Sequence, residues 1–389
     1  MRRSLPILLT LALFAPGRAG SAPAAGDIVG TADGRIAGKA MLGAKSLSLA
    51  GRDVPWQRVA YALLNRGVRP PAAAQAVWLR TGEVWRGRVE SLARGRLAVR
   101  VQPFGRREID ANAAAFVEFA AGRGRPGKLA PRTLYADGRP PMPAALLWFD
   151  AERIAVDSPF GAITLKREDT LWYVFQPPGE GRLGAGEDEV SLVNGTVLRG
   201  RLAGAREGVR LKHALLGDLA IPAAMVRTVL RHAPSAVPLT EVAPASVKAA
   251  GPTGPMPAAE ALTVLRFGES FPTLAFVRAL RLEAGTVVRY ALGKAAGPRQ
   301  LRAVLAPIPH GRGDLQIRIS SGSMTLSQAL LKEGDPPVPL AVPIPESGAI
   351  AIEASFGEHL GVPCAAVLAD PIVALAPEAP AKNQAASNE

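Results

Sequence analysis

The sequence predicts an all-β protein, made of tandem small β-barrel or meander repeats followed by a β-sandwich. The 389 residues include 40 Gly and 35 Pro, a composition that suits many short strands joined by turns better than long helices. Apolar residues alternate with polar ones over short stretches, which is the period of a half-buried strand. A pattern of about 56 residues also recurs along the N-terminal half of the chain.

Residues 1–24 have the features of a secretory signal peptide. Arg2 and Arg3 precede an apolar run from Leu5 to Ala15, and small residues continue to Ala25. The run is about half of the ~20 residues that a membrane-spanning helix needs. We expect a secreted or periplasmic protein with no transmembrane segment after cleavage and a disordered tail at 377–389. An uncleaved anchor is the alternative.

The net charge and the small number of Cys and His residues exclude several classes of function. Cleavage would remove three arginines and no acid, lowering the net charge from +13 to +10. A basic surface attracts polyanions, but the basic residues are dispersed and are not interleaved with aromatics, so we expect no nucleic acid partner. One Cys and four His argue against disulfide scaffolds, zinc clusters and iron–sulfur sites. We therefore predict no metal and no cofactor.

Three segments, 77–120, 133–176 and 188–232, align as copies of one β repeat. A Thr-, Asp- or Asn-Gly pair closes a tight hairpin in each copy, and a later Gly marks a second turn. These glycines are 56 and 57 residues apart at the first turn and 56 apart at the second: Gly82, Gly138 and Gly195, then Gly105, Gly161 and Gly217. A shortened, degenerate copy is expected at 25–65.

The opening x-Asn/Asp-Gly-x4-Gly-x-Leu, a Leu-x-Val strand, the Gly turn and a closing Ile…Val pair resemble Sm-like small β-barrels. The resemblance covers residues 77–232 and implies a barrel of four or five strands in each copy. The copy at 133–176 departs from the pattern, with Pro143 where the others have Gly87 and Gly200. The family's RNA binding is not carried over, because the N-terminus is a secretory signal and no RNA-contact signature is present.

The Pro- and Ala-rich segment 233–260 is interpreted as a linker, and residues 261–376 as a β-sandwich. Ordered motifs in the second segment resemble the NPCBM-type module, a galactose-binding-like jelly-roll sandwich found beside glycoside hydrolases. They include 313–319 (GDLQIRI), 348–357 (GAIAIEASFG) and 368–371 (LADP). The resemblance implies binding of carbohydrate or a cell-surface polymer through this domain.

Aromatic side chains are the expected platform for a sugar, because a sugar ring has an apolar face. All five tryptophans lie outside the predicted sandwich, and core packing is favoured over an exposed strip: Trp56, Trp78, Trp85, Trp148 and Trp172. The aromatics of the sandwich fall mostly on strand patterns: Phe267, Phe271, Phe276, Tyr290 and Phe356. No binding residue is therefore assigned.

No catalytic or metal-ligating set is assigned either. Cys364 lies in an apolar context that favours a buried thiol over a nucleophile. Arg312-Gly313-Asp314 matches a cell-adhesion tripeptide, with chance occurrence favoured, and 187–189 (EDE) is interpreted as a solvated strand entry rather than a metal site. The histidines fit no paired-ligand spacing: His213, His232, His310 and His359.

The sequence thus favours a secreted, non-catalytic binding or scaffold protein with carbohydrate or a cell-surface polymer as ligand. Three alternatives stay open. They are an accessory subunit of a polysaccharide-degrading assembly, a purely structural protein–protein interaction module, and an enzyme with a cryptic site.

Overall fold

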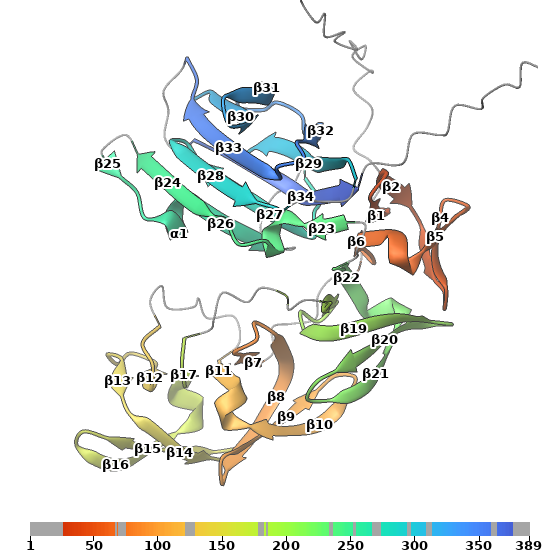
Figure 1. The fold of residues 1–389 in the computed structure, drawn as a ribbon. Helices are drawn as coiled ribbons and strands as arrows, with labels where there is room; N and C mark the ends of the chain where they lie inside the picture. Colours follow the sequence, from red (N-terminus) through yellow and green to blue (C-terminus); the bar gives the residue numbers. More distant parts are fainter. Residues whose placement is uncertain are drawn as a thin grey trace, which may run out of the picture.

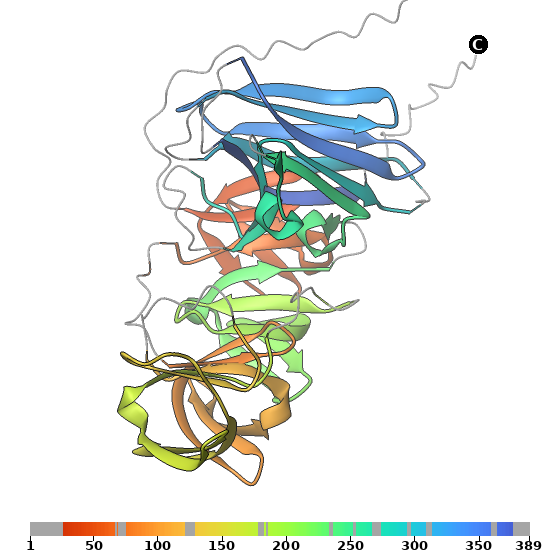
Figure 2. The same cartoon turned by 90° about the vertical axis from the view of Figure 1, so that its left-hand side faces the viewer.

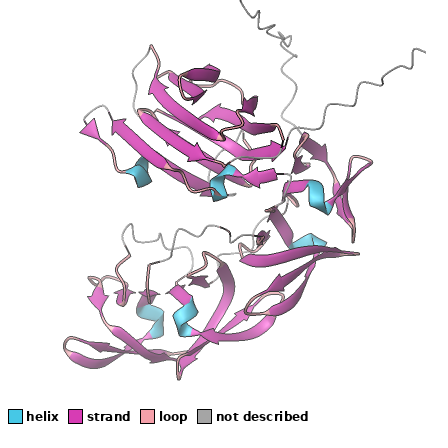
Figure 3. Cartoon of the chain, in the orientation of Figure 1, coloured by secondary structure: helices cyan, strands magenta, loops and turns pink. Residues whose placement is uncertain are grey.

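The computed structural model describes residues 26–66, 68, 75–120, 129–177, 183, 186–232, 236–251, 254–266, 274–293, 297–308, 313–358 and 364–375. The predicted signal peptide and the predicted C-terminal tail lie outside these residues. The described chain is almost entirely antiparallel strand, which confirms the all-β prediction (Figure 3). Its one α-helix is the single turn α1 (Ala258–Ala261), and no helix in the described ranges is long and apolar enough to cross a membrane.

Four small barrels form the N-terminal part, each with the same order of elements: strands, a 3₁₀ turn and a final strand. The first barrel contains β1 (Asp27–Thr31), β2 (Gly34–Gly38), β3 (Ala40–Leu42), β4 (Ser46–Leu49), β5 (Arg52–Pro55), the turn Trp56–Arg58 and β6 (Val59–Leu63). The second contains β7 (Ala76–Leu79), β8 (Val84–Ala93), β9 (Arg96–Val101), β10 (Gly105–Asp110), the turn Ala111–Ala113 and β11 (Ala114–Glu118).

The third and fourth barrels repeat this order. The third contains β12 (Thr133–Ala136), β13 (Met142–Pro143), β14 (Ala145–Phe149), β15 (Arg153–Ser158), β16 (Gly161–Lys166), the turn Arg167–Asp169 and β17 (Thr170–Val174). The fourth contains β18 (Asp188–Leu192), β19 (Val197–Ala205), β20 (Gly208–His213), β21 (Gly217–Pro222), the turn Ala223–Met225 and β22 (Val226–Leu230). In every barrel the first strand pairs with the last.

A glycine lets the second strand of a barrel run unbroken past its neighbour. A Cβ on Gly87 would lie 2.0 Å from the carbonyl oxygen of Arg100, and one on Gly200 would lie 2.3 Å from that of Lys212. Real Cβ atoms do not come this close to backbone. The third barrel has Pro143 instead, and its second strand is broken into β13 and β14.

Gly200→Ala is therefore expected to lower the free energy of unfolding by about 1–3 kcal/mol, the usual cost of forcing an extra carbon into a packed site. Gly297→Ala is the matched control, because its Cβ would meet nothing within 4 Å. Urea unfolding followed by tryptophan fluorescence measures both. Equal midpoints for the two variants would contradict the close-approach explanation.

The four barrels associate in two pairs through their last strands. β11 pairs with β17, joining the second and third barrels, and β6 pairs with β22, joining the first and fourth. The register is the same in both pairs: the third residue of each strand faces the fifth of its partner, as Phe116 faces Val174 and Thr228 faces Leu63. Pairing covers edges that would otherwise expose unpaired backbone groups.

The two pairs of barrels are stacked against each other. Figure 2 shows the sandwich at one end, the first and fourth barrels in the middle and the second and third at the far end. Val197 of the fourth barrel pairs with Val84 of the second, and one apolar core cluster extends through all four barrels.

The C-terminal domain is a sandwich of two antiparallel sheets. One sheet has the order β26-β27-β34-β29-β32 with β23 on β34, and the other has the order β25-β24-β28-β33-β30-β31. Their bounds are β23 (Ala236–Pro238), β24 (Ser246–Gly251), β25 (Gly254–Pro255), β26 (Leu262–Arg266), β27 (Arg278–Glu283), β28 (Thr286–Ala291), β29 (Arg299–Pro307), β30 (Leu315–Ser321), β31 (Met324–Leu331), β32 (Val338–Ile344), β33 (Ala349–Phe356) and β34 (Ala365–Leu375).

The segment 233–260 is not the free linker that its composition suggested. Its strands β23 and β24 pair with β34 and β28, so its described part belongs to the sandwich. Leu239 from the same segment is fully buried in the core of the sandwich. The prolines misled the interpretation because β23 and β25 lie at sheet edges, where a strand tolerates proline.

Candidate functional site

The sandwich presents a cluster of loops at one end. The β29–β30, β31–β32 and β33–β34 connections start or finish there, since Leu315 pairs with both Phe356 and Leu331. The described residues enclose a cavity of about 10 Å³, lined in part by Glu333 and Cys364. That volume holds about one water molecule.

The β31–β32 turn presents exposed polar groups at this end. Lys332 and Glu333 are exposed, and the backbone N–H of Lys332 donates to Asp335 Oδ2 at 2.7 Å, which fixes the turn. We call Lys332, Glu333 and Asp335 the β31–β32 turn below. A fixed turn with free charged side chains is suited to hydrogen bonding of a polar ligand.

Cys364 sits beneath the loops as a buried thiol. It is 6% exposed, and its Sγ lies 3.6 Å from the carbonyl oxygen of Asp314. Burial, with the nearby charges of Glu283 and Asp314, raises the pKa of this thiol. A raised pKa keeps the sulfur protonated and a poor nucleophile, so the geometry agrees with the structural interpretation of Cys364.

The adhesion tripeptide is not presented for binding. Asp314 is only 7% exposed, so its carboxylate is turned away from solvent. Arg312 lies outside the described residues.

The described aromatics of the sandwich offer no exposed platform. Phe276 and Tyr290 are each 2% exposed, and Phe356 packs against the core. Phe267 and Phe271 lie outside the described residues.

Core packing is the correct interpretation for most tryptophans of the barrels. Trp56, Trp85 and Trp172 are buried, and Trp78 stacks on Phe116 with ring centroids 5.0 Å apart. Trp148 is the exception: it is 37% exposed on β14.

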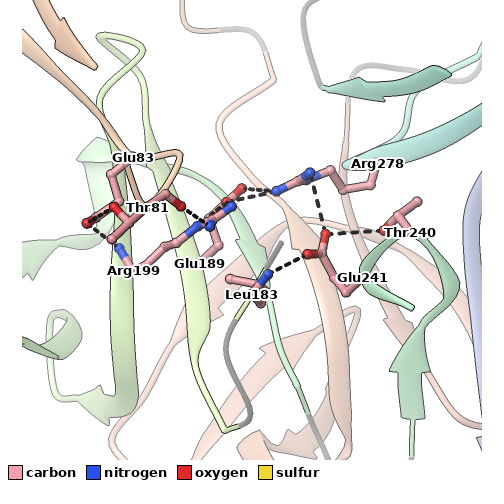
Figure 4. A network of polar contacts seen from close by, with 8 residues as sticks. All are labelled: Thr81, Glu83, Leu183, Glu189, Arg199, Thr240, Glu241 and Arg278. Carbon is pink, nitrogen blue, oxygen red and sulfur yellow. Dashed lines mark hydrogen bonds and ion pairs between the residues drawn. The ribbon is translucent and has the colours of Figure 1, made fainter. Parts of the chain in front are cut away.

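The acidic cluster 187–189 is the main correction to the sequence analysis. Asp188 and Glu189 are 5% and 3% exposed rather than solvated. Glu189 Oε2 lies 2.9 Å from Nη2 of Arg199, and both of its oxygens lie 2.8 Å from Nη2 of Arg278 on the sandwich (Figure 4). Arg199, the cross-strand partner of Glu189 in the β18–β19 hairpin, and Arg278, 89 residues away, neutralise the acid. No local pattern reveals the second of these pairs.

This network joins three parts of the molecule. Arg278 also lies 3.4 Å from Glu241 of the sandwich, and Arg199 donates its backbone N–H to Glu83 of the second barrel at 2.9 Å. His213, buried on β20, lies 2.7 Å from the same Glu83 carboxylate. The network therefore fixes the sandwich against the barrels.

The remaining histidines form no site in the described chain. His232 is half-buried, while His310 and His359 lie outside the described residues. Within the described ranges, no group of three His, Cys, Asp or Glu side chains is placed to hold a metal ion.

An apolar joint with one carboxylate holds the sandwich against the first barrel. Tyr61 of β6 packs there with Val277 and Ile372 of the sandwich. Burial raises the pKa of Asp370, on β34, to about 6, and burial together with this carboxylate raises the pKa of Tyr61. Strongly perturbed groups often mark active sites, but these two are closed off from any substrate by the joint.

No family model and no curated protein matches the sequence. Among solved structures, the chain is similar to a CBM51 module from Clostridium perfringens GH95 in complex with methyl-galactose, at 11% identity and a TM-score of 0.28, covering 36% of this chain and 99% of that one. It is also similar to the M60 catalytic domain with two CBM51 domains of Clostridium perfringens ZmpB, at 9% identity and a TM-score of 0.28, covering 87% of this chain and 37% of that one. An exo-β-1,3-galactanase from Phanerochaete chrysosporium matches at 11% identity and a TM-score of 0.21, covering 75% and 69%.

Proposed function

We propose that this is an extracytoplasmic, non-catalytic binding protein whose C-terminal sandwich recognises carbohydrate or a cell-surface polymer at its loop end. The observation that carries the proposal is the orientation of β34. Ile372 and Ala374 near its end are buried in the joint with the first barrel, whereas Ala365 at its start lines the loop-end cavity. Seven residues of strand separate them by roughly 20 Å, so the β31–β32 turn stays clear of the joint while the opposite end is held.

The ligand class is supported by two further features. The ordered motifs of the sandwich resemble the NPCBM-type module, and two stacked antiparallel sheets with free end loops are an arrangement that places binding residues on loops over a rigid scaffold. The Sm-like barrels serve in this proposal as a rigid support. A non-catalytic role is supported by the burial of Tyr61 and Asp370, the most strongly perturbed groups.

Retention of the full chain on immobilised neutral glycans, at low and high salt, tests this function. A fragment limited to 261–376, the sandwich as the sequence delimits it, is unsuitable because it lacks β23, β24 and β25. We expect retention on a galactan or glucan that high salt leaves unchanged, because a neutral glycan is bound without ion pairs. The double variant Lys332→Ala, Glu333→Ala is expected to weaken it about tenfold through lost hydrogen bonds.

Lys248→Ala is the matched control, an exposed lysine on β24 of the same domain. Unchanged retention of the double variant, or no retention of the wild type on any neutral glycan, would contradict the proposal. The second outcome would direct the search to protein partners.

A further inference from the structure

The second and third barrels share one continuous sheet. Its strands are hydrogen-bonded in the order β10-β9-β8-β14-β15-β16, with Phe149 of β14 paired to Leu92 of β8 at the junction. Phe149 and Leu92 are 1% and 3% exposed and face the cores. The opposite, outer face of this shared sheet lies at the end of the molecule away from the sandwich (Figure 1).

Trp148 stands on the outer face, next to Phe149. Its cross-strand partner is Ala155, which is only 5% exposed despite pointing outward, as expected if the indole lies over it. On the other side, the antiparallel register that pairs Phe149 with Leu92 brings Ala93 to the next position. Ala155 and Ala93 have small side chains, so the 37% exposed indole of Trp148 projects beyond its two cross-strand neighbours.

Arginines flank this ring from both barrels. The guanidinium carbon of Arg153 lies 6.0 Å from the Trp148 ring centroid, and Arg96 is the cross-strand partner of Ala93. Both arginines are exposed, and in the described part of the chain neither is within ion-pair distance of a carboxylate. One cation thus lies over the ring, and a second lies on the same face two strands away, where Arg96 Nη2 donates to the backbone oxygen of Glu108 at 3.3 Å.

The same face carries like charges in direct opposition. Arg100 of β9 pairs in register with Arg88 on one side and Arg106 on the other, and Arg153 pairs with Lys166. Like charges opposite one another destabilise a sheet. Acids offset part of this: Glu90 lies 2.8 Å from Arg100 and 3.0 Å from Arg106, and Glu108 and Glu168 pair with Arg106 and Lys166 at 2.7 and 3.5 Å. Arg96 and Arg153, which have no carboxylate within ion-pair distance in the described chain, favour an anionic ligand.

We propose that the outer face of the shared sheet binds an acidic polysaccharide, with Trp148 stacking on a uronic acid ring and Arg96 and Arg153 meeting its carboxylates. An indole face suits the apolar face of a pyranose, and guanidinium groups bind carboxylates with charge-assisted hydrogen bonds. A single ring favours a sugar over a single-stranded nucleic acid, because nucleic acid grooves stack successive bases on several aromatics. This site is separate from the loop end of the sandwich and does not depend on it.

Binding of the full chain to polygalacturonate, compared with its fully methyl-esterified form, tests the site. The wild type is expected to bind the acid polymer and to lose binding when the carboxylates are esterified or the salt is raised. Trp148→Ala is expected to weaken binding about tenfold, and the double variant Arg96→Ala, Arg153→Ala by a similar factor. Trp148 fluorescence, isolated as the difference between wild type and Trp148→Ala, is expected to change on binding.

Phe160→Ala is the matched control, because Phe160 is 92% exposed at the β15–β16 turn of the same barrel but away from the ring. The Lys332, Glu333 double variant is expected to bind polygalacturonate normally, which separates this site from the sandwich site. Wild-type affinity in Trp148→Ala would overturn the proposal. So would tighter binding of single-stranded DNA than of polygalacturonate.

Discussion

Replacing Arg278 by Met is expected to lower the free energy of unfolding by about 3–5 kcal/mol, the cost of removing one partner from a buried ion pair. Burial alone would lower the pKa of Arg278, but the facing carboxylates of Glu189 and Glu241 outweigh it and raise that pKa. Without the guanidinium, Glu189 keeps Arg199. Among the described residues, Glu241 then keeps only the backbone N–H of Leu183, at 2.8 Å, and the hydroxyl of Thr240, at 3.4 Å. The loss is therefore concentrated on Glu241.

Tryptophan fluorescence makes this a test of coupling between domains. All five tryptophans lie in the barrels, whereas Arg278 lies in the sandwich. If the network holds the two together, urea unfolding of Arg278→Met shifts the fluorescence midpoint downward. Adding Glu241→Gln is expected to restore much of the loss, because it removes the unpaired charge.

Arg281→Met on the same strand is the control. Its side chain is 39% exposed and pairs with Glu283 at 2.6 Å, an arrangement that contributes little, about 0–1 kcal/mol. An Arg278→Met midpoint no lower than that of Arg281→Met would show that the network does not couple the domains.

Sequence reasoning identified the barrels because each is built from local contacts. Hairpins pair residues close in the chain, so glycines at turns and alternating apolar residues mark them directly, even in the shortened copy expected at 25–65. The pairing of barrels was not visible. The last strand of the fourth barrel, β22 (Val226–Leu230), is buried along its whole length. Such an apolar strand could pair with the last strand of any other barrel, and nothing in its local sequence selects the first barrel over the third.

At the candidate sites, too, local features could be predicted from the sequence and contacts between distant segments could not. Trp148 lies in 145–149 (ALLWF), where five apolar residues in a row hide the period of two. The strand also has a register shift between Leu146 and Trp148, which a sequence pattern does not reveal. Glu189 and Arg278 are 89 residues apart. Burial of the acid could be foreseen only by knowing that the sandwich folds back onto the fourth barrel.

The carboxylate of Asp370 lies buried in the joint between the first barrel and the sandwich, and burial disfavours its ionised form. Oδ1 accepts hydrogen bonds from the backbone N–H groups of Val277, at 2.7 Å, and Arg278, at 3.1 Å. The Tyr61 hydroxyl also interacts with this carboxylate. Burial raises the pKa of this carboxyl from 3.8 to about 6, against the lowering effects of the Val277 N–H and the Arg35 charge.

The raised pKa of Asp370 determines whether the free energy of unfolding rises or falls with pH. Between about pH 4 and 6 the folded state binds more protons than the unfolded state, so this group's contribution to stability falls as the pH rises through that window. Above pH 6 the buried, ionised carboxylate costs about 3 kcal/mol, and below pH 4 the cost disappears. The joint between barrel and sandwich is accordingly more stable in mild acid than at neutral pH.

Asp370→Asn separates this contribution from all others, because the amide oxygen still accepts from Val277 and Arg278 while the charge is gone. Relative to wild type, the variant is expected to gain about 2 kcal/mol in free energy of unfolding between pH 4.5 and 7.5. Asp150→Asn is the control: the backbone N–H groups of Glu152 and Arg153 lower the pKa of Asp150, so this variant changes relative to wild type only below about pH 4 and stays parallel to it between pH 4.5 and 7.5. Parallel unfolding curves for wild type and Asp370→Asn would mean that Asp370 reaches water, and with it that the joint opens in the native state.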